Sequence, residues 1–512
     1  MVGSYDSAPA PGDAPVRGGV KAVEAPVCVP TKASYAPAYA SAKAVGMSPA
    51  PVLRRPPPRG ILDRLNRDGE GRTIMANKAE GTEDLYGARM RAWERMQQVA
   101  RETFAPYGFS AIETPAMEQV STFVHGIGES TDVVRKEMFR VFSGALLDRV
   151  FAAGNDAGLK PKQRLAMRPE GTAGVVRAAV ENNFVPQGGA PVKLWYAEPM
   201  FRGERPQKGR LRQFHQVGIE WLGAPDPAAD AECIIILMDF YRALGIDPSH
   251  LHLAINSMGD AACRPAYREK VRSFILDHAD EMCDECRERA EINPLRAFDC
   301  KNDHCREVMA DAPLAHENLC EECAAHYEQV KRYLDEAGIA YEEDPTLVRG
   351  LDYYTRTVFE VDYTPDPAIG AIGGGGRYDG LMELEGGKPT PGIGFAVGFE
   401  RIMLALEAEG IDLGGVEPSC VYVAGTEAEM RPAVFSATLA LRRAGIRTEA
   451  DYQGRSLKAQ FKQADKHNAE LCVVIGPDEV AAGAATIRDM KTHEQTSVAM
   501  AELASAVAER LA

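Results

Sequence analysis

The sequence lacks any long apolar run. Its 512 residues contain no stretch of eighteen or more consecutive apolar residues, and the N-terminus has no short apolar core of the kind found in secretory signals. These absences argue against a membrane span and against export. They predict a cytoplasmic protein with no membrane partner.

Positive charge is also scarce. The chain has 58 Lys and Arg against 74 Asp and Glu, a net charge of −16. Proteins that coat nucleic acid usually carry an excess of Lys and Arg, because these side chains neutralise the phosphate backbone. Any nucleic-acid site in this chain must therefore be local.

Cysteines are few but clustered. Six of the eleven lie between residues 283 and 323, whereas a secreted disulfide scaffold spreads them along the whole chain. Two C-x-x-C pairs, with 33 residues between them, have the spacing of a four-cysteine zinc site. Structural Zn²⁺ and reduced thiols both remain open at Cys283, Cys286, Cys320 and Cys323.

Residues 1–74 have no hydrophobic periodicity and are rich in Ala and Pro. They are predicted to be a disordered extension. Their ten basic residues are scattered among six acidic ones, which disfavours an organellar targeting peptide. An alternative is that Met75 is the true first residue.

Two folded regions are expected beyond this extension. In 75–410, a helix from Glu83 to about Pro106 precedes a strand over 109–117, and more strands follow to about 245. Residues 256–343 look mostly helical and form an insertion domain that holds the cysteines. Strands return at 351–363 and 393–400. In 418–512, strands and helices alternate, which predicts a small α/β domain with a mainly parallel sheet.

The densest signal is YAEPMFRGERPQKGRLRQFHQVGIEWLG, residues 196–223. Two extended runs flank a basic, turn-prone tip, so we expect a long antiparallel hairpin. Period-two alternation puts Phe214, Gln216 and Glu220 on one face, with Arg212 and Gly218, and Val217 and Ile219 on the other. Such a polar face with one aromatic suits a nucleotide. The alternative is a solvated ribbon.

FRGERPQKGRLRQFHQ closely resembles motif 2 of class II aminoacyl-tRNA synthetases in its histidyl form. MRPEGTAGVVRA (167–178), LVRGLDYYTRTVFE (347–360), IGGGGRYDGL (372–381) and GIGFAVGFERIML (392–404) follow the order of that family. The resemblance covers about residues 80–512. It implies an α+β catalytic domain with an antiparallel sheet flanked by helices, a helical insertion domain, a C-terminal α/β anticodon-binding domain and a homodimer.

The resemblance also implies an ATP site with Mg²⁺. Arg202 would hold the α-phosphate, Glu204 and Phe214 would contact adenine, and Arg401 would clamp the nucleotide from the opposite side. The full ATP set is Arg202, Glu204, Arg210, Phe214 and Arg401.

The L-histidine site follows from the same resemblance. Glu170 and Thr172 would lie near the α-amino group, and Gln216 near the carboxylate. Glu220, Tyr354 and Tyr378 would surround the imidazole, because a carboxylate can accept an imidazole N–H. Simpler roles stay open: Glu170 as a turn cap, Tyr353 or Tyr354 as core aromatics. The full set is Glu170, Thr172, Gln216, Glu220, Arg349, Tyr353, Tyr354 and Tyr378.

The implied activity is histidine–tRNA ligation, in which L-histidine is activated with ATP to histidyl-adenylate and then transferred to the 3′ end of tRNA(His). No protein nucleophile is needed, so catalysis would come from Arg202, Arg349 and Mg²⁺. Arg349 could instead simply pair with Asp352 or Glu360. One alternative function is an inactive regulatory subunit of ATP phosphoribosyltransferase in histidine biosynthesis. Another is a tRNA-sensing module.

A basic stripe lies in the C-terminal region. Arg455, Lys458, Lys462 and Lys466 recur at spacings of three and four, which places them along one helix. Such a stripe is usually a solvated face. With the resemblance, it predicts a local tRNA surface that reconciles RNA binding with the acidic total.

Overall fold

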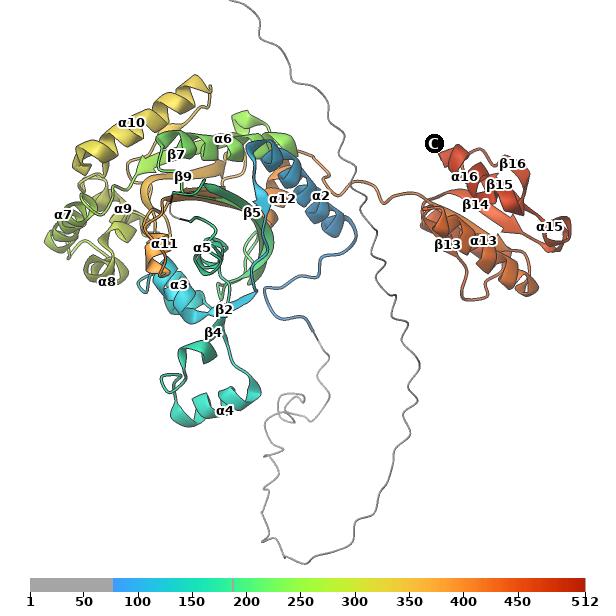
Figure 1. The fold of residues 1–512 in the computed structure, drawn as a ribbon, viewed down its shortest axis with the longest axis horizontal. Helices are drawn as coiled ribbons and strands as arrows, with labels where there is room; N and C mark the ends of the chain where they lie inside the picture. Colours follow the sequence, from blue (N-terminus) through green and yellow to red (C-terminus); the bar gives the residue numbers. More distant parts are fainter. Residues whose placement is uncertain (1–76, 187, 512) are drawn as a thin grey trace, which may run out of the picture. The chain divides into compact units, whose positions relative to one another are not determined.

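The computed structural model describes residues 77–186 and 188–511, so the predicted disordered extension at 1–74 lies outside the described residues. The described chain forms one part built on an eight-stranded sheet and, from residue 420, another built on a five-stranded sheet (Figure 1). No helix within the described ranges combines the length and apolar character that a membrane crossing requires.

The eight-stranded sheet is antiparallel across its six central strands and has one short parallel strand at each edge. This confirms the predicted α+β class. The expected hairpin is present as β5 and β6, whose ten residue pairs run from Val192 opposite Leu222 to Phe201 opposite Gln213. In spatial order the strands are β1 (Ser110–Ala111), β5 (Val192–Phe201), β6 (Gln213–Leu222), β11 (Gly392–Gly398), β10 (Ala371–Arg377), β9 (Thr355–Tyr363), β7 (Leu251–Ser257) and β8 (Glu342–Glu343).

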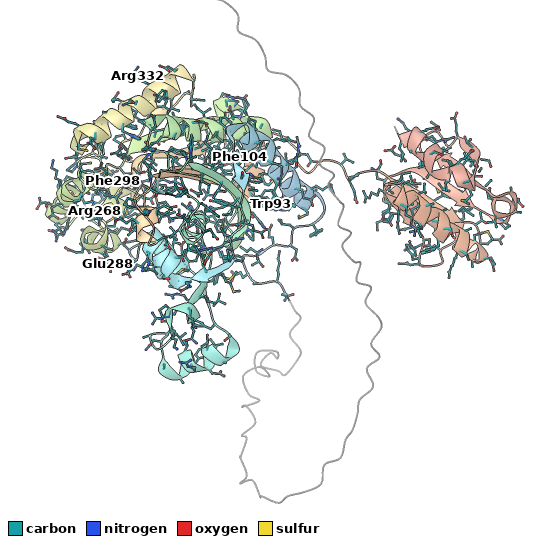
Figure 2. All side chains as sticks on the ribbon, viewed as in Figure 1. Trp93, Phe104, Arg268, Glu288, Phe298 and Arg332 are labelled. Atoms are coloured by element: carbon teal, nitrogen blue, oxygen red, sulfur yellow. The ribbon has the colours of Figure 1, made fainter. Side chains whose placement is uncertain are left out.

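Helices α2 (Gly87–Phe104), α6 (Pro227–Leu244) and α12 (Phe399–Ala408) cover one face of this sheet. Trp93 and Phe104 of α2 are buried there (Figure 2). The Phe104 ring centroid lies 5.4 Å from that of Phe240 on α6 and 6.0 Å from that of Phe395 on β11. The predicted first helix is therefore confirmed, and its apolar stripe joins helix, helix and sheet in one core.

Helices α3 (Val120–Ile127), α5 (Thr172–Glu181) and α11 (Leu381–Leu384) pack on the other face. Figure 1 shows α5 inside the curve of the sheet. A small antiparallel sheet adjoins them, with α4 (Gly144–Ala153) between two of its strands. These strands are β2 (Met117–Gln119), β4 (Leu165–Met167) and β3 (Arg140–Val141).

The predicted continuous strand over 109–117 is wrong. Only β1 and the first residue of β2 fall within it, and they belong to different sheets. Pro115 has no N–H to give to a ladder. The backbone N–H of Thr114 donates instead to the buried carboxylate of Glu198, at 2.5 Å. This segment therefore crosses from one sheet to the other.

Four helices lie between β7 and β8. They fall in the region expected to be mostly helical, and α10 packs against α6. A short 3-10 turn, Pro294–Ala297, separates the second and third of them. The helices are α7 (Arg264–Asp277), α8 (Asp284–Ile292), α9 (Asp303–Met309) and α10 (Glu321–Glu336).

The five-stranded sheet, taken by itself, is mixed. β13, β12 and β14 are parallel, as expected, but two further strands pair antiparallel and were not predicted. Apolar side chains from α13 and α16 pack on one face, and α14 covers the other. The elements are β12 (Cys420–Gly425), α13 (Arg431–Arg443), β13 (Thr448–Ala450), α14 (Leu457–Lys466), β14 (Ala469–Ile475), α15 (Pro477–Ala482), β15 (Ala484–Asp489), β16 (Gln495–Ala499) and α16 (Leu503–Leu511).

Candidate active site

A cavity of about 540 Å³ lies along the β5–β6 hairpin and reaches strand β10 and the start of helix α12. Residues from four separate motifs meet on its wall. The cavity therefore brings together all five residues predicted for ATP, and two of those predicted for histidine, Gln216 and Arg349. The five are Arg202, Glu204, Arg210, Phe214 and Arg401.

The hairpin end of the cavity is cationic and aromatic. The Arg202 guanidinium carbon lies 5.2 Å from the centroid of the Phe214 ring, and its Nε donates to the carbonyl of Pro169 at 2.8 Å. Glu204 lies between two arginines, with oxygens 3.7 Å from Arg202 and 3.5 Å from Arg210. The two guanidinium groups beside Glu204 are of the kind that binds phosphate oxygens, and Glu137 is a second carboxylate at this end of the cavity.

Arg401 enters the cavity from the opposite wall, two residues into α12. It donates to the carbonyl of Ala371 on β10. Burial and the nearby Arg210 lower the pKa of Arg401, because both disfavour its charged form. Beside it, the carboxylate of Glu400 accepts a hydrogen bond from the backbone N–H of His215 at 3.1 Å. The Nδ1 of the His215 ring lies 3.1 Å from the same carboxylate, so these contacts tie α12 to β6.

A second group of predicted residues surrounds Glu220, which is completely buried on β6. Thr172 donates to one of its oxygens at 2.7 Å, and the Tyr378 hydroxyl donates to the other. Burial raises the pKa of Glu220 to about 8, although these hydrogen bonds act to lower it. The site is therefore a buried acceptor held ready for a polar partner.

Glu170 lies beside this group at the start of α5. Its carboxylate accepts the backbone N–H groups of Thr172 at 2.8 Å and Ala173 at 2.9 Å. Burial raises the pKa of Glu170, against the opposing effect of these N–H groups. The Tyr353 hydroxyl lies 3.4 Å from the same carboxylate. Glu170 thus accepts N–H groups at the start of α5, as a cap would, and its carboxylate also lies next to the hydroxyl of Tyr353.

Glycines on the neighbouring strand make room for the buried group. A Cβ at Gly394 would collide with a carboxylate oxygen of Glu220, and one at Gly392 would collide with the Tyr378 ring. No other residue fits at these positions without moving the site.

Arg349 lies on the cavity wall. One of its Nη atoms pairs with Glu360, so of the two alternative partners the structure shows Glu360. Its Nε is buried without a hydrogen-bond partner, and the same is true of the Oε1 of Gln216. A Cβ at Gly374 would come within 3.0 Å of the guanidinium. Both residues line the cavity, so a ligand bound there can supply the partners that these atoms lack.

Family comparison decides the identity. The Histidyl-tRNA synthetase profile matches residues 81–402, and the Anticodon binding domain profile matches residues 420–510. The chain belongs to the histidyl-tRNA synthetase family.

Individual relatives of this synthetase family agree. Histidine--tRNA ligase of Anaeromyxobacter sp. (strain K) is 46% identical over 439 residues, which cover 85% of this chain and all of the relative. That of Desulforamulus reducens is 43% identical and covers 84% of this chain and 98% of the relative. The crystal structure of apo S. aureus histidyl-tRNA synthetase superposes with a TM-score of 0.67 at 34% identity, over 84% of this chain and 99% of that one.

Within this synthetase fold, six of the predicted histidine-site residues are buried and do not line the cavity. They are Glu170, Thr172, Glu220, Tyr353, Tyr354 and Tyr378. Gln216 joins the two groups, since it lies on β6 between Phe214 and Glu220. The Tyr353 ring centroid lies 4.6 Å from that of Tyr354 and 5.8 Å from that of Tyr378.

Sequence reasoning missed several residues of the site. The Tyr196 hydroxyl lies 3.5 Å from Glu220. The buried Arg377 pairs with Asp230 and Asp379, which fixes the strand end that carries Tyr378. Period-two alternation on β5 could have flagged Tyr196. The helical region also supplies cavity residues that no motif indicated: Glu285, Arg289, Arg296, Asp299 and Lys301.

The predicted cysteine quartet is wrong in its pairing. Cys283 and Cys286 lie with Cys300 and Cys305, whereas Cys320 and Cys323 lie with Cys263 and Asp260. The reason is that α9 and the turn before it bring 300 and 305 back to the start of α8, while Cys320 and Cys323 open α10 elsewhere. None of the ten cysteines within the described ranges is in a disulfide.

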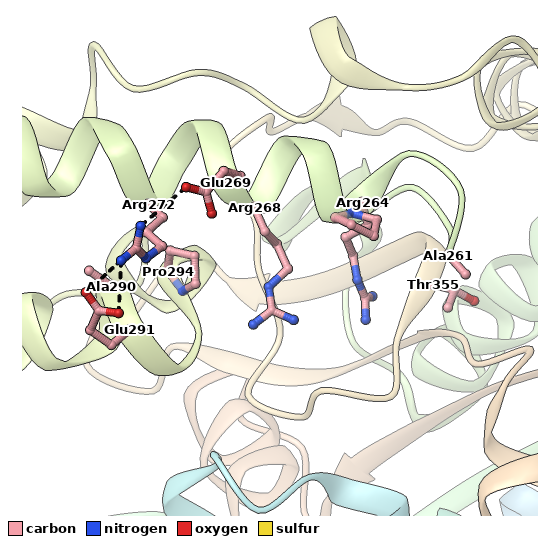
Figure 3. A pocket seen from close by; sticks show the side chains of 10 residues that line it. Ala261, Arg264, Arg268, Glu269, Arg272, Ala290, Glu291, Pro294 and Thr355 are labelled. Carbon is pink, nitrogen blue, oxygen red and sulfur yellow. Dashed lines mark hydrogen bonds and ion pairs between the residues drawn. The ribbon is translucent and has the colours of Figure 1, made fainter.

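A further pocket of about 470 Å³ lies along α7 (Figure 3). Arg264, Arg268 and Arg272 line it at one-turn intervals, and Arg272 pairs with Glu291 at 2.9 Å. Arg264 donates to backbone carbonyls of the loop that carries the tyrosines, including that of Tyr354. The pocket contains none of the predicted site residues. Arg264 fastens α7 to that loop, whereas Arg268 and Arg272 fasten α7 to α8.

The basic stripe is shorter than expected. Lys458, Lys462 and Lys466 are exposed along α14. Arg455 precedes the helix and pairs with Asp451 at 3.0 Å, because the turn before α14 directs it there. The stripe therefore consists of three lysines.

Proposed function

We propose that this chain is a histidine–tRNA ligase that forms histidyl-adenylate across the junction of the cavity and the buried Glu220 group, and then charges tRNA(His). The observation that carries this is the single polar face of β6, on which Phe214, Gln216 and Glu220 run from the cationic cavity to the buried acceptor. A nucleotide at one end and an imidazole at the other would place the α-phosphate and the substrate carboxylate beside Gln216. Reaction between neighbours held in this way needs no protein nucleophile.

For ATP, we assign Arg202 to the α-phosphate and Phe214 to stacking on adenine, with Arg401 over the opposite side of the nucleotide. Glu204 and Arg210 complete the pocket around the base and the phosphates. Mg²⁺ bound with ATP would neutralise phosphate charge, and Glu137 and Glu400 are wall carboxylates of the type it prefers.

For histidine, we assign Glu220 to an imidazole N–H, with Thr172 and Tyr378 orienting the carboxylate. Tyr353 and Tyr354 form the wall of the same pocket, and Glu170 takes the α-ammonium group. A pocket that must otherwise leave such buried polar groups unpaired discriminates strongly against other side chains. Specificity for histidine follows from this arrangement.

Histidine-dependent exchange of pyrophosphate into ATP tests the activity. We expect exchange with L-histidine and none with the other amino acids. An ATP phosphoribosyltransferase regulatory subunit would give no exchange. The solved ATP phosphoribosyltransferase regulatory subunit/histidyl-tRNA synthetase from Bacillus halodurans C is 17% identical to this chain with a TM-score of 0.54, so it shows a shared fold alone. A tRNA-sensing module would bind tRNA without exchange. Absence of exchange with histidine would reject the ligase.

We assign tRNA recognition by the anticodon-binding domain to the Lys458, Lys462 and Lys466 stripe, within a cytoplasmic enzyme. Charge reversal at Lys458 and Lys462 should weaken tRNA binding by roughly tenfold or more, the effect expected when hydrogen bonds to charged phosphates are removed. The slope of binding against salt should become shallower by about one for each phosphate that a lysine no longer neutralises.

Filter binding at several salt concentrations measures this effect. Arg443→Glu/Arg510→Glu is the matched control, because it changes the charge of the same domain by the same amount on α13 and α16, which pack on the sheet face opposite α14. Pyrophosphate exchange should be unchanged in both variants. If the control weakens tRNA binding as much as the stripe variant, the stripe is not the RNA surface.

We also propose a homodimer in which the segment Leu85–Met117 contacts a second copy. Light scattering at micromolar concentration should give twice the chain mass of 55.6 kDa. Met117→Lys should shift the mass toward the monomer, since this side chain is 51% exposed. Val480→Lys places the same charge on another exposed apolar residue and should leave the mass unchanged. A monomer with full activity would contradict the dimer.

A further inference from the structure

Four cysteine thiols converge between the ends of α8 and α9. The Sγ atoms of Cys283, Cys286, Cys300 and Cys305 all lie within 4.8 Å of one another, and those of Cys283 and Cys300 are 3.8 Å apart. Three of the four residues are buried, and Cys283 is half-buried.

The spacing of the sulfur atoms selects the chemistry. Two sulfurs joined in a disulfide lie about 2.05 Å apart. Four thiolates at about 2.3 Å from one tetrahedral Zn²⁺ lie about 3.8 Å from each other. The 3.8 Å between Cys283 and Cys300 is too long for a disulfide and fits this spacing, and all four sulfur atoms lie close enough together to reach one ion. Among divalent ions, an all-sulfur tetrahedral set favours Zn²⁺.

We propose that Cys283, Cys286, Cys300 and Cys305 bind one structural Zn²⁺. Binding releases the thiol protons to solvent and changes no oxidation state. The surrounding backbone supports the charge, because the N–H of Cys283 donates to the Cys305 sulfur at 3.2 Å. This set differs from the quartet indicated by the C-x-x-C spacing, since only the first pair belongs to it.

A metal at this site would stabilise two short helices. Helices α8 and α9 have nine and seven residues, lengths at which an isolated helix is marginal in water. A metal joining Cys283 to Cys305 closes the segment that contains α8, the turn after it and the first residues of α9. Zn²⁺ therefore takes over part of the stabilisation that a larger core would give.

The closed segment also forms part of the active-site wall. Arg289, Arg296 and Lys301 line the cavity of the synthetase site. Ala290 and Pro294 of the same segment line the pocket along α7 (Figure 3). Zinc that joins the two ends of the segment thus fixes the positions of Arg289, Arg296 and Lys301 on the cavity wall, without touching substrate.

The second group, Asp260, Cys263, Cys320 and Cys323, provides the matched control. Its carboxylate is already engaged, by Arg356 at 3.2 Å and by the backbone N–H of Ala262 at 2.9 Å. Its Cys320 belongs to the quartet predicted from spacing but not to the four-thiol cluster. Replacing Cys320 therefore separates the two assignments.

Metal content of the full chain, purified under reducing conditions, tests the proposal. Cys300→Ser and Cys305→Ser should each hold about one Zn²⁺ fewer per chain than the wild type, and in Cys320→Ser this Zn²⁺ should remain. Wild-type zinc content in Cys300→Ser, or no zinc in the wild-type chain, would overturn it.

Alkylation of the wild-type chain, mapped by mass spectrometry, gives an answer even if a variant does not fold. Cys283 is partly accessible, yet it should resist alkylation until a chelator removes zinc. After chelation, Cys286, Cys300 and Cys305 should be alkylated together with Cys283. Reaction of Cys283 at the same rate with and without chelator would also overturn the proposal. Neither measurement uses catalytic activity, so the outcome is independent of the proposed function.

Discussion

Arg349→Ala should slow histidyl-adenylate formation by about a hundred- to a thousand-fold, the loss of roughly 3–4 kcal/mol expected when one preorganised donor is removed from a transition state. Charge builds on the α-phosphate as the substrate carboxylate attacks, so a fixed guanidinium helps the transition state more than the ground state. Arg349→Lys should recover only part of the rate, because an ammonium cannot reproduce the planar fork. Single-turnover adenylate formation at saturating histidine measures the step directly.

The pairing of Arg349 with Glu360 supplies the control. If the arginine only anchors β9, then Glu360→Gln should damage activity and thermal stability as much as Arg349→Ala does. If it acts on the α-phosphate, Glu360→Gln should keep most of the rate, since the guanidinium remains in the cavity. A stable Arg349→Ala variant with a near-normal rate, or with a defect confined to the KM for histidine, would remove this residue from catalysis.

At pH 9, where Glu220 is ionised, Glu220→Gln should lower kcat/KM for histidine by about 10- to 150-fold, since a hydrogen bond to a charged group contributes roughly 1.5–3 kcal/mol. The KM for ATP should change little, because Glu220 does not line the cavity. In the wild type, the pKa of about 8 means that the carboxyl ionises as the pH rises through 8. The KM for histidine should therefore fall over this range, and the glutamine variant should lack that dependence.

The thermal stability of the protein tests the same residue in a second way, because ionisation of Glu220 should lower stability while it strengthens histidine binding. The folded-state pKa of Glu220 lies above its ordinary value of 4.5. Its contribution to stability is thus fully present below about pH 4.5 and is lost as the pH rises through about 8. Glutamine does not titrate, so Glu220→Gln should gain melting temperature over the wild type at pH 9 relative to pH 5. A variant equally destabilised at both pH values would mean that Glu220 serves packing alone.

The local sequence determined several elements of the fold. The β5–β6 hairpin and the division of its residues between two faces follow from period-two alternation around a basic turn. The α2 helix follows from its apolar spacing and from the Pro106 and Gly108 that end it. The five residues predicted for ATP could be expected to share one cavity wall, because each lies in a short motif whose residues act together.

Only the tertiary structure decided the grouping of the cysteines, the path of residues 109–117 and the environment of Glu220, because each depends on contacts between residues far apart in the chain. The pairing of Cys283 with Cys300 rather than Cys320 depends on how short helices turn back, which the C-x-x-C spacing does not encode. The path of 109–117 was set by Glu198, a buried acceptor from another strand that took the Thr114 N–H. The raised pKa of Glu220 needs the complete burial that Thr172, Tyr196 and Tyr378 create from three other segments. Local patterns fix which face a side chain occupies, and only packing between distant segments fixes what it meets there.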